Sequence, residues 1–70
     1  MLTIMFRNKC VENFIEVPEK SVVSVDQVTD STLQIKFFDP FAAEAYCYYS
    51  DEVVYIMNSK GSTISTHRVK

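Results

Sequence analysis

The residues best suited to chemistry in this sequence lie together near its end. His67, Arg68 and Lys70 fall within four positions, and a histidine beside cations and a carboxylate can cleave RNA by general acid–base catalysis. The chain has no other histidine, so it offers no second imidazole for such a mechanism. We therefore expect His67 to be an ordinary residue of an exposed strand, and a small RNase-like enzyme is the third of three functions considered.

The cysteines and clustered acids form no metal or redox motif. Cys10 and Cys47 lie 37 positions apart, which is neither a metal-ligand spacing nor a CxxC pattern, and we expect both to be small buried hydrophobic residues. Glu12, Glu16 and Glu19 would share one face of a helix, but their segment has the pattern of a strand ended by a proline. The sequence thus predicts no enzyme, and no catalytic, cofactor-binding or metal-binding residues.

Charge is sorted along the chain. Residues 1–10 carry +2, residues 60–70 carry +3 and the middle carries −7, for a net charge of −2. If the two ends meet in the fold, they form a basic pole that, with sheet-borne aromatic side chains, suits a nucleic acid. The acidic pI of about 5.2 argues against this, so nucleic-acid binding is the alternative function. Its candidate residues are Arg7, Lys9, Lys60, His67, Arg68 and Lys70.

A cluster of tyrosines favours protein binding as the first function. Tyr46, Tyr48 and Tyr49 cannot all point inward from a helix, and in a strand Tyr46 and Tyr48 would share the face opposite Tyr49. Beside Asp51 and Glu52 they predict an aromatic patch with an acidic rim, suited to the basic surface of a partner protein. These five residues are the predicted partner-binding site of a small regulatory module, of the inhibitor class that viruses and mobile elements encode.

The elements that must position these residues have mostly the pattern of strands. Apolar and polar residues alternate over 2–7, 11–17, 23–26 and 33–38, and the apolar run 52–57 suits a central strand. Residues 58–61 predict a hairpin turn that uses Gly61, and 62–69 a polar edge strand. The positions with the strongest period of two, together with the apolar run, predict a core of Leu33, Ile35, Phe37, Val54 and Ile56.

Residues 40–49 are predicted to form the one helix. Asp39 is a preferred N-cap, Pro40 is preferred at the first helical position, and three alanines follow. The rival interpretation is a strand over 43–49 that turns at Ser50-Asp51, favoured by the strand propensity of the tyrosines. The predicted fold is a single α+β domain over 1–70, a mostly antiparallel sheet of five to six strands with one short helix. The alternative is a small all-β barrel or sandwich.

Composition sets the remaining expectations. A chain of 70 residues buries only about 60% of its unfolded surface, and 47% of this one is hydrophobic, so apolar side chains should remain exposed. A homodimer is therefore a second expected partner. The apolar residues at the start are too few for a signal sequence, and no run approaches the roughly 20 apolar residues of a membrane span. We expect a cytoplasmic protein with reduced thiols and no membrane contact.

Overall fold

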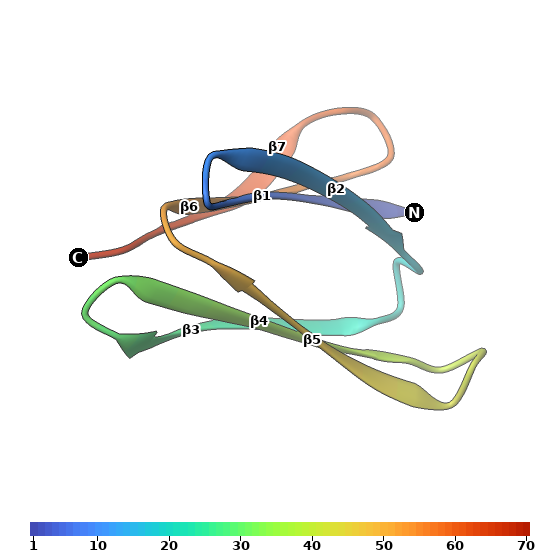
Figure 1. Cartoon of the computed structure of the whole chain (residues 1–70). Coiled ribbons are helices and arrows are strands. Elements are labelled where there is room, and N and C mark those ends of the chain that lie inside the picture. The colour runs from blue at the N-terminus through green and yellow to red at the C-terminus, as the bar shows by residue number, and fades with distance from the viewer.

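A computed structural model describes all 70 residues as seven antiparallel strands and no helix. Four strands form one sheet in the order β2-β1-β6-β7, and three form a second in the order β3-β4-β5. Figure 1 shows the two sheets as separate layers, with the three-stranded sheet below the other. The strands are β1 (Leu2–Asn8), β2 (Val11–Val17), β3 (Val22–Thr29), β4 (Thr32–Asp39), β5 (Glu44–Ser50), β6 (Val53–Met57) and β7 (Thr63–Arg68).

The α+β prediction is wrong, and the all-β alternative fits. Residues Glu44–Ser50 form β5, and Pro40–Ala43 form a turn that joins it to β4. A helix this short is marginal without a packed face, whereas the strand gains a full ladder with β4 and turns Tyr46 and Tyr48 onto the core. Pairing with β4 therefore outweighs the helix propensity of the alanines. With no helix in the fold, none is present that could span a membrane.

The core lies between the two sheets. Alternate residues of β1, β4 and β6 point inward, as the period of two predicts, and all five predicted core residues are buried. The apolar run does form a central strand, because β6 lies between β1 and β7, but only the face with Val54 and Ile56 is buried, rather than both faces. The complete buried apolar cluster is Ile4, Phe6, Val17, Leu33, Ile35, Phe37, Val54 and Ile56.

The sheets are joined where β5 passes into β6. Ser50 is fully buried there, and its hydroxyl lies 2.8 Å from the carbonyl oxygen of Arg7 and 3.2 Å from that of Val53. The amide of Asp51 also donates to the Arg7 carbonyl, at 3.0 Å. These bonds tie the connection between the sheets to the end of β1.

Candidate protein-binding surface

The strand β5 divides the tyrosine cluster between its two faces. Tyr46 and Tyr48 face inward and both stack on Phe37, with ring centroids 5.1 and 6.1 Å away. Tyr49 faces outward, which confirms the expectation for a strand. The Tyr46 hydroxyl donates to Glu44 at 2.7 Å, and this bond, followed by partial burial and the nearby carboxylates, raises the pKa of Tyr46. Two of the three tyrosines thus contribute to packing rather than to an exposed patch.

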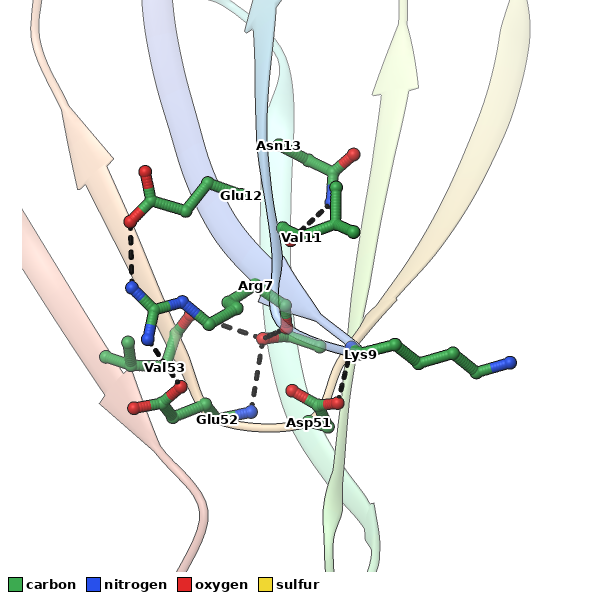
Figure 2. Close-up of polar contacts among 9 residues, drawn as sticks. Arg7, Lys9, Val11, Glu12, Asn13, Asp51, Glu52 and Val53 are labelled. Atoms are coloured by element: carbon green, nitrogen blue, oxygen red, sulfur yellow. Dashed lines mark hydrogen bonds and ion pairs between the residues drawn. The ribbon is translucent and has the colours of Figure 1, made fainter.

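The two acids of the predicted rim bind groups of the chain itself. Figure 2 shows the Arg7 guanidinium between Glu12, at 2.8 Å, and Glu52, at 3.1 Å. Hydrogen bonding to Glu12 and the charge of Glu52 raise the pKa of Arg7. Asp51 accepts a hydrogen bond of 2.6 Å from the backbone amide of Lys9. The structure therefore does not bring the five predicted partner-binding residues into one surface.

The outer face of β3-β4-β5 carries several exposed apolar side chains in adjoining positions. The ladder places Val22, Phe38 and Ala45 side by side, a set that we call the apolar row. Val22 is 78% exposed and Phe38 47%, and Phe41 in the adjoining turn is 82% exposed. A groove of about 440 Å³ runs over this face. Small monomeric proteins rarely leave adjoining large side chains uncovered in this way.

The groove contains a single charge. The residues Ser24, Lys36 and Cys47 form the next row across the same three strands, which we call the lysine row. Lys36 is the only charged residue that lines the groove, and it makes no ion pair. The groove is therefore mostly apolar, with one unpaired cation on the middle strand β4.

The predicted basic pole is only partly assembled. Lys9 lies in the turn after β1, at one end of the four-stranded sheet, whereas Lys60 lies in the β6–β7 turn at the other end. Arg7 is held by its two acids. The other three candidates, His67, Arg68 and Lys70, do come together, because all three line a cleft of about 380 Å³ between the C-terminal part of the chain and the β3–β4 hairpin.

The prediction that both cysteines are buried is wrong. Cys10 and Cys47 are free and exposed. Cys10 lies in the β1–β2 turn, outside the core, and Cys47 shares the outward parity of Tyr49 on β5. The structure groups no three histidine, cysteine, aspartate or glutamate side chains that could hold a metal ion.

Of the predicted partner-binding residues, only Tyr49 lies on the outer face of β3-β4-β5, and the apolar row was not predicted. Phe38 has the opposite parity to the core residue Phe37, so alternation alone indicates that it points outward. The alignment of Val22 and Ala45 beside it depends on the order and register of three strands, which local patterns do not provide. Phe41 has the spacing of an apolar stripe on the predicted helix, which does not form.

Comparison of the chain with protein-family models, with curated proteins and with solved structures finds no match.

Proposed function

We propose that this chain is a cytoplasmic, non-enzymatic module that binds another protein through the outer face of β3-β4-β5. The observation that carries the proposal is the apolar row, which lines a groove with one unpaired lysine, while Phe41 is exposed in the adjoining turn. Aromatic and aliphatic side chains of this kind are the anchors of protein interfaces, where a polar group fixes orientation. A regulatory or inhibitory role fits a small domain that exposes an apolar face of this kind.

The chemistry of the face defines the partner. The apolar row requires an apolar surface on the other protein. Lys36, which lies in the neighbouring row, requires a carboxylate on that protein beside the apolar surface. A partner that covers Lys36 without an acid would leave a desolvated, unpaired charge, which is costly. The proposed partner is therefore an apolar protein surface that carries an acidic residue, rather than the basic surface expected from the sequence.

Site-specific photo-crosslinking tests this function. A benzophenone analogue of phenylalanine at position 38 should give a discrete adduct in the host cell, and the purified cross-linked protein should bind the chain again. The matched control is the same analogue at Phe14, which is also an exposed phenylalanine but lies on the other sheet. Lys36→Glu should abolish the adduct. Identical adducts from both positions, or an adduct that survives Lys36→Glu, would contradict the proposal.

Nucleic-acid binding is a second candidate because His67, Arg68 and Lys70 line one cleft. Asp26 also lines this cleft, but neither Arg68 nor Lys70 makes an ion pair, so both cations are available to phosphates. Binding of a fluorescent single-stranded oligonucleotide should then weaken steeply with salt and with Arg68→Ala. An absence of binding at low salt would eliminate this candidate.

A further inference from the structure

The last strand of each sheet leaves a second surface open for binding. β7 ends the four-stranded sheet and β3 ends the three-stranded one, so each of these strands pairs on one side only. We infer that β7 binds an extended acidic peptide segment of another protein as an additional strand, in the cleft between β7 and the β3–β4 hairpin. This surface is separate from the outer face of β3-β4-β5, and the inference therefore goes beyond the proposed function.

The pairing of β7 with β6 shows which backbone groups such a peptide would bind. The amide of Val69 donates to the carbonyl oxygen of Glu52, at 3.2 Å, so these residues form a hydrogen-bonded pair. Hydrogen-bonded and non-hydrogen-bonded pairs alternate along an antiparallel ladder, and His67 therefore also directs its backbone groups at β6. Thr66 and Arg68 direct theirs away from β6. The open edge of β7 thus presents the N–H and C=O groups of these two residues to the cleft.

The cleft follows the backbone of both outer strands. It has a volume of about 380 Å³ and is lined by consecutive residues, 66–68 of β7 and 25–27 of β3. Because strands advance about 3.4 Å per residue, three residues of an extended peptide span about 10 Å and match this length of edge. Beyond Arg68 the chain crosses toward β3, where the amide of Lys70 donates to Gln27 Oε1 at 3.1 Å. The peptide would therefore end before Lys70.

The side chains around the cleft define the sequence of the peptide. Residues opposite one another in neighbouring strands share a face, so a carboxylate opposite Arg68 would lie close enough to pair with it. Arg68 makes no ion pair within the chain, and Asp26 is the only acid that lines the cleft. The peptide residue opposite His67 would point to the core side, where Val25 and Leu33 favour an apolar side chain. The expected segment thus alternates acidic and apolar residues.

A peptide satisfies more of this edge than a nucleic acid does. Phosphate oxygens accept hydrogen bonds, so they could bind the two N–H groups and the side chains of Arg68 and Lys70. They donate none, and the C=O groups of Thr66 and Arg68 would stay unpaired. A peptide backbone supplies both donors and acceptors, as in other cases of strand addition to a sheet edge.

Amide hydrogen exchange of the native chain, followed by NMR, tests the inference residue by residue. The probe is a peptide of alternating aspartate and valine. At a peptide concentration about ten times Kd, exchange of the Thr66 and Arg68 amides should slow roughly tenfold. The amide of His67 already bonds within the sheet and should change little.

Two methylated peptides provide a matched pair of controls. In the expected register the aspartates lie opposite Thr66 and Arg68, so their amides face β7 and the valine amides face away. Methylation of the aspartate amides should therefore abolish the protection, whereas methylation of the valine amides should preserve it.

Substitutions of opposite sign test the charges. Arg68→Gln should weaken binding of the peptide about fivefold, and Asp26→Asn should strengthen it by a similar factor. Lys60→Gln removes a cation from a turn outside the cleft and should leave the affinity unchanged.

Several results would overturn the inference. They are unprotected amides at Thr66 and Arg68, equal effects of the two methylated peptides, an unchanged affinity of Arg68→Gln, or equal binding of a lysine–valine peptide. Protection of the same amides by a single-stranded oligonucleotide and not by the peptide would also overturn it, and would assign this edge to a nucleic acid. Photo-crosslinking from position 38 reports on the other surface, so either proposal can fail while the other stands.

Discussion

At the scale of single residues, alternation along a strand predicts burial better than residue type does. Leu33, Ile35 and Phe37 are buried because they share one parity of β4, and their burial could be read directly from the sequence. Cys47 is exposed although free cysteines are usually buried, because its parity puts it on the outer face. The cluster of tyrosines likewise suggested an interface. Alternation along β5, however, points Tyr46 and Tyr48 inward, where both stack on Phe37.

Ser50 is expected to contribute stability through its position between the sheets. Ser50→Ala removes a buried hydroxyl that bonds the Arg7 carbonyl, although the Asp51 amide still donates to that oxygen. The free energy of unfolding should therefore fall by about 1 kcal/mol. Urea denaturation measures the change, with Ser24→Ala as the control because Ser24 is exposed on β3. Equal effects of the two substitutions would show that the Ser50 bonds contribute nothing specific.

The raised pKa of Tyr46 predicts that the free energy of unfolding falls at alkaline pH. Its pKa in the folded chain is raised, chiefly by the hydrogen bond to Glu44, so the folded state holds the phenolic proton more tightly than the unfolded state does. This contribution is fully present below the unfolded pKa of about 10 and is lost as pH rises through the folded pKa.

The matched variant is Tyr46→Phe, which keeps the ring on Phe37 and removes the titrating group. The free energy of unfolding of the native chain should fall more steeply above about pH 10 than that of the variant. Parallel pH profiles of the two proteins would contradict the role assigned to this hydroxyl.

At the scale of elements, local sequence signals such as capping residues locate the ends of segments. Pairing between strands decides whether a segment becomes a helix or a strand. The Asp39 carboxylate accepts hydrogen bonds from the amides of Phe41, at 2.9 Å, and Ala42, at 3.2 Å, which is the capping expected of it. The capped segment is nevertheless a turn, because the residues after it pair with β4. Six strands could be located approximately from the sequence, whereas β5 was predicted as a helix, because its type depends on pairing with the neighbouring strand β4 and on packing of Tyr46 and Tyr48 against the core.

The β1–β2 turn is expected to store backbone strain. Lys9 and Cys10 both have positive φ, at 52° and 65°, although neither is glycine. Left-handed backbone costs an ordinary residue about 1 kcal/mol, so Cys10→Gly should raise the free energy of unfolding by about that amount. Urea denaturation measures the gain, and a lower midpoint would contradict this account of the turn.

Gly61 in the β6–β7 turn allows the opposite substitution, from glycine to alanine, at a position with positive φ. Its φ is 82°, and an added Cβ would meet no atom within 4 Å, so Gly61→Ala introduces backbone strain without a steric clash. It should lower the free energy of unfolding by about 1 kcal/mol.

At the scale of the whole molecule, two small sheets leave much apolar surface outside the core. Only ten residues are buried, and the apolar row lies on the face turned away from the second sheet. Small domains often gain their remaining stability from association, and an exposed apolar face of this kind is where association would bury surface. Sequence composition indicated that some apolar surface would remain exposed, but its location required the strand order.

The central claim is that the outer face of β3-β4-β5 is the surface that binds a partner protein, and photo-crosslinking from that face tests it most directly. The account predicts a discrete adduct with another protein from position 38, and no such adduct from position 14, where Phe14 is exposed on the other sheet. Identical adducts from both positions, or an adduct from position 38 that survives Lys36→Glu, would contradict it.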